Sequence, residues 1–294
     1  MCKNEKEGGV TVRKIDKAYL EITNACNLSC SFCHGTKRAR KLITAEEFEQ
    51  LTDALVGQIK FLYFHLMGEP LLHPLFPQFV KRAWEKGFYP ILTTNGSLLS
   101  KCAETVLENL PYKISISLHA PAANAAFADP AYFDNCIEFA KRAAKKGCIT
   151  VLRLWNVGGD GEEENDAILA RLHEAFPEQW APSHRDSVRM SRDKVFLEWG
   201  EHFEWPDPTA PEAPDGTSIF CRALRDQIGV LADGTVVPCC LDADGNIPLG
   251  NLFSTPLEDI LEGPRAKAIY DGFTEHRAVE DMCRRCGYAR RFEK

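Results

Sequence analysis

Three cysteines in one short segment have the spacing of ligands for metal chemistry. Cys26, Cys30 and Cys33 form the pattern Cys-x3-Cys-x2-Cys, and the next cysteine along the chain is Cys102. Each thiolate can bind one iron of a cubane [4Fe–4S] cluster, which normally takes four cysteines. One iron would therefore lack a protein ligand, and an open position is what separates a reactive metal site from a structural one. Structural zinc is the alternative, but it needs a fourth nearby ligand and usually another spacing.

The same three-cysteine motif resembles the signature of the radical S-adenosylmethionine (SAM) superfamily. The resemblance implies that the amino and carboxylate groups of SAM chelate the fourth iron. It also implies reductive cleavage of SAM to a 5′-deoxyadenosyl radical, which removes a hydrogen atom from the substrate. A flavodoxin- or ferredoxin-type protein would donate the electron. The cofactor would supply the radical chemistry, while the protein positions the substrate and excludes other hydrogen donors.

Two turns resemble further superfamily motifs that bind SAM. Gly68-Glu69-Pro70 resembles the GGEP turn, with Met67 in place of its first glycine. By resemblance, its backbone and acidic side chain receive the SAM ammonium group. Thr94-Asn95-Gly96 resembles the TNG motif at a strand end. The resemblance also suggests Phe32 against the adenine, Ser117 near the ribose and carboxylate, and Arg153 as a bidentate partner of the carboxylate.

Several of these residues have a plainer interpretation. Phe32 could simply pack in the core, and Arg153 could belong to a salt bridge at the barrel rim. His34 follows the cluster motif, and His65 and His119 lie at strand ends. At these places a histidine could take part in catalysis or could equally be structural. No catalytic residue beyond the cluster ligands is assigned from the sequence.

A second group of cysteines lies near the C-terminus. Twelve residues separate Cys221 from Gly234, and four more precede Cys239. This spacing resembles the opening of the SPASM module, and the single later pair Cys283-x2-Cys286 resembles its shortened "twitch" form. By resemblance, Cys221, Cys239, Cys283 and Cys286 would bind one auxiliary [4Fe–4S] cluster. Cys240 could replace Cys239 or pack beside it, and a zinc ribbon is the alternative reading of these cysteines.

Alternating strand and helix patterns indicate a parallel sheet covered by helices. Periodicity also permits a doubly wound sheet, and the resemblance selects a partial (β/α)6 TIM barrel. A Pro-rich segment then precedes an Ala232-Asp233-Gly234 hairpin signal. We expect a radical SAM core at 10–204, a linker at 205–216 and a SPASM or twitch domain of hairpin plus helix at 217–294. The predicted strands are 18–23, 61–65, 89–93, 114–118, 148–154, 195–197, 227–231 and 235–238. The predicted helices are 44–56, which opens with the capping-box pattern Thr44-Ala-Glu-Glu47, and 75–86, 100–108, 131–146, 163–176 and 256–270.

Composition restricts the classes of protein further. The 294 residues carry a formal net charge of −7, which argues against nucleic acid or an anionic membrane as the main partner. No apolar run is long enough to span a membrane, and the charged N-terminus lacks a signal peptide. We therefore expect a cytoplasmic protein, whose twelve cysteines indicate metal binding rather than disulfides.

Two clusters favour a net oxidation, in which the substrate radical passes an electron to the auxiliary cluster. Only about seventeen residues precede the first predicted strand, too few for the leader-binding domain of many peptide-modifying relatives. We therefore favour an oxidoreductase that dehydrogenates a small molecule. The alternative is a peptide maturase that forms crosslinks or thioethers, and a distant third is a non-enzymatic metal-binding or electron-transfer protein.

Overall fold

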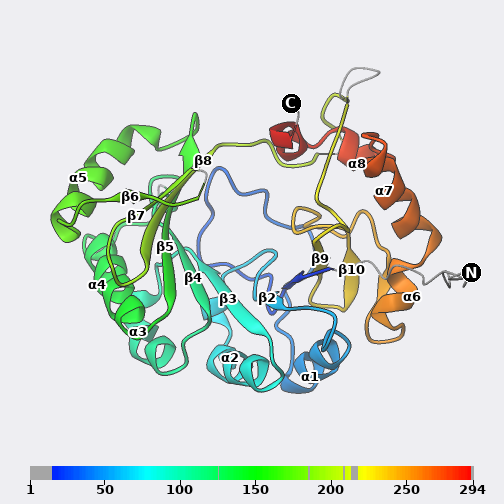
Figure 1. Cartoon of the computed structure of the whole chain (residues 1–294), viewed down its shortest axis with the longest axis horizontal. Coiled ribbons are helices and arrows are strands. Elements are labelled where there is room, and N and C mark those ends of the chain that lie inside the picture. Colours follow the sequence, from blue (N-terminus) through cyan, green and yellow to red (C-terminus); the bar gives the residue numbers. More distant parts are fainter. Residues whose placement is uncertain (1–14, 125, 185, 208, 213–217, 293–294) are drawn as a thin grey trace, which may run out of the picture.

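Six parallel strands form the centre of the molecule in a computed structural model that describes residues 15–292, except 125, 185, 208 and 213–217. They curve into an open arc rather than a closed barrel (Figure 1). This arrangement confirms the partial (β/α)6 barrel. The strands are β1 (Lys17–Leu20), β2 (Phe61–Tyr63), β3 (Tyr89–Thr94), β4 (Lys113–Ser117), β5 (Ile149–Val157) and β8 (Val195–Glu201).

The helices between these strands cover the convex side of the arc (Figure 1). The first begins with the predicted capping box: the Glu47 amide donates to Thr44 Oγ1 at 3.1 Å, and the Thr44 amide donates to Glu47 Oε2 at 2.8 Å. These bonds satisfy amide groups that have no partner within the helix. The helices are α1 (Ala45–Asp53), α2 (Phe76–Glu85), α3 (Leu99–Glu108), α4 (Tyr132–Lys145) and α5 (Asn165–Ala175), with short 3-10 turns η1 (Pro70–Leu72) and η2 (Glu162–Glu164).

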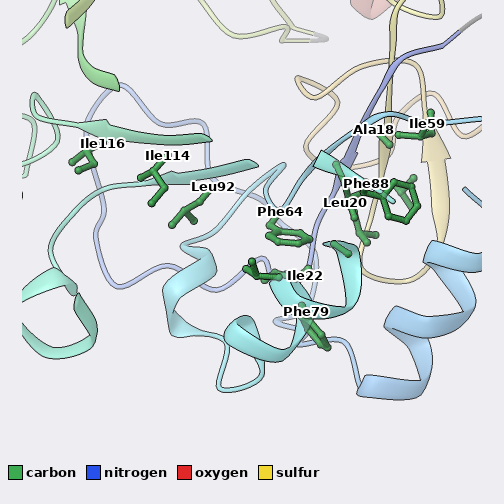
Figure 2. Packing of buried hydrophobic residues seen from close by; sticks show 14 of the residues in the cluster. Ala18, Leu20, Ile22, Ile59, Phe64, Phe79, Phe88, Leu92, Ile114 and Ile116 are labelled. Atoms are coloured by element: carbon green, nitrogen blue, oxygen red, sulfur yellow. The ribbon is translucent and has the colours of Figure 1, made fainter. Parts of the chain in front are cut away.

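The main core lies between the sheet and these helices (Figure 2). Leu20, Phe64, Leu92, Ile114 and Ile116 are buried there. Burial of each such side chain contributes about 1.5–3 kcal/mol. Side chains along a strand point alternately to the two faces of the sheet, so the strand residues next to these buried ones point to the concave face.

Two short strands extend the sheet beyond β8, and the sequence analysis did not predict them. They are β6 (Ala181–Pro182) and β7 (Ser187–Arg189), joined to each other and to β8 in antiparallel pairing. Strands of two and three residues are too short to show an alternating pattern.

The C-terminal part adds three strands at the opposite edge. The predicted hairpin is confirmed as β9 (Gln227–Val230) and β10 (Thr235–Val237), followed by β11 (Gly250–Asn251). β9 also pairs in parallel with β1, from Lys17 opposite Gln227 to Leu20 opposite Val230. One sheet of eleven strands therefore runs through both halves of the chain.

The single helix predicted at 256–270 is wrong. The chain forms α6 (Leu257–Leu261) and α7 (Pro264–Thr274), with a break at Gly263. Pro264 has no amide hydrogen to continue the first helix, but it suits the first position of the second. The helix predicted at 163–176 likewise begins as η2 before α5. Two short helices, α8 (Asp281–Arg284) and η3 (Gly287–Phe292), complete the chain. No helix among the described residues is both long and apolar enough to cross a bilayer.

Candidate cofactor and substrate site

Cys26, Cys30 and Cys33 lie in the loop that follows β1. The Cys33 amide donates a hydrogen bond to the Cys30 carbonyl at 3.0 Å, which folds the loop into a turn. Burial raises the pKa of the Cys30 thiol to about 11, and the thiolates of Cys33 and Cys26 add to this effect. The three thiols therefore lie near enough to interact, and as thiolates they would repel one another without a cationic partner. This donor set fits a cluster that takes three protein thiolates.

A glycine turn is docked against the base of this loop. Gly68 has φ +82°, and a Cβ there would lie 2.5 Å from the Thr23 carbonyl oxygen and 2.8 Å from that of Ala25. The Glu69 amide also donates to the Ala25 carbonyl at 2.8 Å. Only glycine meets both demands, the left-handed backbone and the close approach. Met67, by contrast, replaces the first glycine of the related motif without conflict, since its side chain is buried among apolar residues.

The Glu69 side chain ties this turn to the end of β3. Its buried carboxylate accepts hydrogen bonds from the Leu71 amide at 3.0 Å, the Thr94 hydroxyl at 2.9 Å and the Asn95 amide at 2.8 Å. Burial raises the pKa of Glu69 to about 7, while these three donors oppose the rise. The structure thus brings Gly68, Glu69, Thr94 and Asn95 together, and their contact with SAM stays a prediction. Pro70 lies in the same turn as the first residue of η1.

Asn95 links β3 to the cysteine loop. Its side-chain amide donates to Asn27 Oδ1 at 3.1 Å and lies 3.8 Å from Cys26 Sγ. A hydrogen-bond donor beside a cluster sulfur can tune a cluster's reduction potential. The TNG-like turn therefore contacts the loop as well as Glu69.

Phe32, Ser117 and Arg153 all face the concave side. The Phe32 ring packs 4.9 Å from the ring of His119. The guanidinium carbon of Arg153 lies 3.5 Å from the centre of the Trp155 ring, and its Nε lies 3.7 Å from Glu198 Oε1. The salt bridge weighed as the plainer role of Arg153 is therefore present. Whether these residues bind SAM stays a prediction.

The C-terminal cysteines converge from three segments. Cys221 precedes β9, Cys239 follows β10, and the last pair lies in and after α8. Burial raises the pKa of Cys239, and the thiolates of Cys240, Cys221 and Cys283 add to it. The pKa of Cys283 is likewise raised by burial and then by Cys221 and Cys286. These cysteines, distant in sequence, therefore lie near enough to interact electrostatically, and their binding of a four-thiolate cluster stays a prediction.

Cys240 lies beside this group and interacts electrostatically with Cys239 and Cys221. It packs against Leu66 and Val237 in a small separate cluster, whereas the other four cysteines pack against the main core. A hydrogen bond from Tyr19 opposes the burial that raises the pKa of Cys240 to about 12. This contact supports the packing role, and the choice between Cys239 and Cys240 as ligand stays a prediction.

A cavity of about 490 Å³ separates the two cysteine groups. Phe32 and Cys33 line it from the loop, and Cys221, Cys239, Cys240, Cys283 and Cys286 line it from the C-terminal part. Its floor is the concave face of the sheet, and the residues there that sequence reasoning did not assign are Tyr19, Tyr63, Lys113 and Glu198. Polar residues at every second strand position, as in Lys113-x-Ser115-x-Ser117, were the signal that could have found them.

The Pro-rich segment begins against the cluster loop. The Trp205 indole nitrogen donates to the Phe32 carbonyl at 2.9 Å, and Trp205 also lines the cavity. The division of the chain into a core, a linker and a C-terminal domain stays a prediction, and part of the linker lies outside the described residues. Trp205, at the start of the Pro-rich segment, thus forms part of the cavity wall.

Comparison with known proteins identifies the superfamily. The family description "Radical SAM superfamily" matches residues 20–172, just over half of the chain. The SPASM description, "Iron-sulfur cluster-binding domain", matches residues 221–287. The chain therefore belongs to the radical SAM superfamily and carries a SPASM-type domain. Enzymes of this superfamily use SAM and a [4Fe–4S] cluster, and the SPASM domain adds further iron–sulfur chemistry.

Individual relatives differ in what they act on. The chain is 23% identical to the antilisterial bacteriocin subtilosin biosynthesis protein AlbA of Bacillus subtilis, over 92% of this chain and 65% of AlbA. It thus spans slightly less than two thirds of that relative. Its fold is similar to that of BtrN in complex with AdoMet and 2-DOIA, with a TM-score of 0.61, 19% identity and 92% of each chain covered. It is also similar to Streptococcus suis SuiB bound to precursor peptide SuiA, with a TM-score of 0.59, 15% identity, and 95% and 71% of the chains covered.

Proposed function

We propose that this chain is a radical SAM oxidoreductase that dehydrogenates a small molecule. The observation that carries the proposal is the cavity, whose lining includes Cys33 of the first cysteine group and four cysteines of the second. A substrate in it would lie between the two predicted cluster sites. The proposal includes a flavodoxin- or ferredoxin-type electron donor and a cytoplasmic location, where thiols stay reduced.

In this proposal the residues hold and orient groups that the cofactors act on. When bound, the clusters and SAM supply the one-electron chemistry that removes hydrogen and an electron from the substrate. Cys26, Cys30 and Cys33 hold the first cluster, and Gly68 lets the SAM-binding turn approach the loop. Glu69 fixes that turn to β3 through three hydrogen bonds. Trp205 covers the loop side of the cavity and helps to exclude water.

The similarity to BtrN supports a small molecule, since it covers 92% of both chains and the BtrN structure holds 2-DOIA. Peptide modification is the second candidate. It is supported by the similarity to AlbA over 92% of this chain and to SuiB bound to its precursor peptide. Both candidates require an electron acceptor near the substrate, so the cavity alone does not choose between them.

The first experiment tests the two cysteine groups separately. Wild-type protein, reconstituted without oxygen and given SAM and dithionite, is expected to form 5′-deoxyadenosine. The triple variant Cys26→Ala/Cys30→Ala/Cys33→Ala should form none and keep about four irons per chain. The double variant Cys283→Ala/Cys286→Ala should also lose about four irons but still cleave SAM. An electron-transfer protein would give no 5′-deoxyadenosine in any sample.

The second experiment separates the two substrate classes. 5′-Deoxyadenosine formation is measured with 2-DOIA and with polyols that carry a carboxylate or a phosphate, and in parallel with the SuiA peptide. Stimulation by a polyol, with loss of two hydrogens from the product by mass spectrometry, supports dehydrogenation. The Cys283→Ala/Cys286→Ala variant should then lose the oxidised product while it still cleaves SAM. Stimulation by the peptide alone would replace our proposal with the second candidate.

A further inference from the structure

The charged residues of the cavity do not balance. Although the whole chain has a formal net charge of −7, four cationic side chains and two carboxylates line the cavity. The cations are Lys17, Lys113, Arg153 and Arg222, and the carboxylates are Asp226 and Glu198. The cysteines of the lining would contribute negative charge only as cluster ligands, beside the two cysteine groups, so the cations on the sheet floor still call for negative charge from elsewhere.

Both carboxylates are already shared. Asp226 Oδ2 lies 3.2 Å from Lys17 Nζ and 3.5 Å from an Arg222 terminal nitrogen. Glu198 Oε1 accepts a hydrogen bond from the Trp155 indole nitrogen at 3.0 Å and lies 3.7 Å from Arg153 Nε. One carboxylate therefore serves Lys17 and Arg222, and the other is left for Arg153 and Lys113.

Arg153 lacks the hydrogen bonds that a buried guanidinium needs. Its side chain is only 14% exposed, and within the described part of the chain it donates no hydrogen bond. Its Nε is buried without a partner, because 3.7 Å to Glu198 is too long for a hydrogen bond. Stacking on Trp155 holds the guanidinium plane but satisfies none of its five donors. A ligand oxygen in the cavity would satisfy them.

Lys113 has a similar deficit. It begins β4 and makes no ion pair with any residue that the structure describes. Burial lowers the pKa of Lys113, Glu198 opposes this, and Arg153 and Lys17 add to it. Arg153, Lys113 and Glu198 thus line one cavity and interact electrostatically across it. An anionic group among them would turn repulsion into attraction.

The depth of Lys113 distinguishes this site from the predicted SAM site. Lys113 lies four residues before Ser117 on β4, roughly 13 Å further from the carboxyl end of the strand at about 3.3 Å per residue. The cysteine loop and the Gly68 turn follow the carboxyl ends of β1 and β2. Arg153 lies opposite Ser117, whereas Lys113 lies four residues deeper, so it is Lys113 that separates this site from the predicted SAM site.

We propose that the cavity binds a substrate that carries an oxyanion, a carboxylate or a phosphate, between Arg153 and Lys113. The inference rests on the proposed function, because it takes the cavity as the substrate site. Arg153 offers a planar pair of donors to two oxygens, and Lys113 adds a compact positive charge. The substrate class is thus an acid or a phosphate ester rather than an amine or a neutral polyol.

Equilibrium dialysis of the cluster-loaded protein tests this proposal without a known substrate. Radiolabelled inorganic phosphate and acetate are the probes, methylammonium is the cationic control, and saturating SAM is present throughout. We expect saturable binding of at least one oxyanion and none of methylammonium. Lys113→Met and Arg153→Gln should each weaken binding by about tenfold or more, as expected for a lost charged hydrogen bond. Lys101→Met, on the exposed surface of α3, should bind like wild type.

The outcomes separate this inference from the proposed function. Iron content and circular dichroism show that each variant is folded, and Arg153→Lys, which keeps the charge but not the paired donors, should weaken binding less than Arg153→Gln. Absence of oxyanion binding, equal binding by Lys113→Met, or displacement of the oxyanion by SAM would overturn the inference. Failure of wild type to form 5′-deoxyadenosine would instead overturn the proposed function, and it would leave the measured oxyanion binding intact.

Discussion

At the scale of single residues, Gly68 has the narrowest tolerance in the candidate SAM site. An added Cβ would lie 2.5 Å and 2.8 Å from two carbonyl oxygens of the cysteine loop, and these backbone atoms cannot move aside cheaply. The φ of +82° adds strain for any other residue. The glycine thus couples the turn to the loop that holds the first cysteines.

Gly68→Ala should therefore destabilise the protein and impair its first cluster. Gly87→Ala is the matched control, because Gly87 has φ +86° but nothing within 4 Å of the added Cβ. The control should lose about 1–2 kcal/mol of unfolding free energy from backbone strain alone. Gly68→Ala should lose roughly 1–3 kcal/mol more from overpacking. Denaturant unfolding and SAM binding measure the two effects, and equal losses in both variants would contradict the steric argument.

The two adjacent cysteines Cys239 and Cys240 make a second residue-scale prediction. Both interact electrostatically with Cys221, but Cys239 packs against the main core, whereas Cys240 packs against the small cluster that contains Leu66. Cys239→Ala should lose about four irons per chain, and Cys240→Ala should lose none. Iron analysis and the spectrum of the auxiliary cluster check this. The reverse result would make Cys240 the ligand.

At the scale of elements, local signals predicted what depends on local chemistry. The capping box at Thr44 marked the start of α1, and Ala232-Asp233-Gly234 marked the turn between β9 and β10. The six parallel strands were found because each is an apolar run between helical patterns. Their closure into a partial barrel came from the resemblance, since periodicity does not fix curvature.

Other elements depend on contacts that the sequence does not display. β6 and β7 exist because β8 offers an edge to pair with, and the α6–α7 break depends on one proline within an otherwise helical pattern. The site residues likewise divide into those with a local sequence signal and those placed by the fold. The cysteines were singled out by their spacing and the Gly68 turn by its resemblance to a family motif, whereas Lys113 and Glu198 belong to the cavity only because their strands turn these positions inward. Ordinary polar residues that only the tertiary fold brings together form no recognisable sequence motif.

At the scale of the whole molecule, the two cysteine-bearing parts share one sheet. β1 pairs with β2 of the core on one side and with β9 of the C-terminal part on the other. Lys17 and Asp226 join the same two strands at 3.2 Å, and Trp205 holds the Phe32 carbonyl at 2.9 Å. The segments before and after the predicted boundary at 204–217 are thus separate in sequence but joined by strand pairing in the fold.

We therefore expect that the chain cut after residue 204 will not remain soluble. The cut exposes the edge of β1, with its unpaired amides and carbonyls, and uncovers the cysteine loop where Trp205 packs. Co-expression of residues 205–294 as a separate chain should restore solubility, because β9 would again cover that edge. In the intact protein, calorimetry should show one cooperative unfolding transition. A soluble fragment 1–204 that keeps about four irons, or two separate transitions, would mean that the sheet is divided into independent domains. The cavity between the two cysteine groups would then depend on how two mobile parts meet, whereas the shared strand pairing predicts that it is fixed when the chain folds.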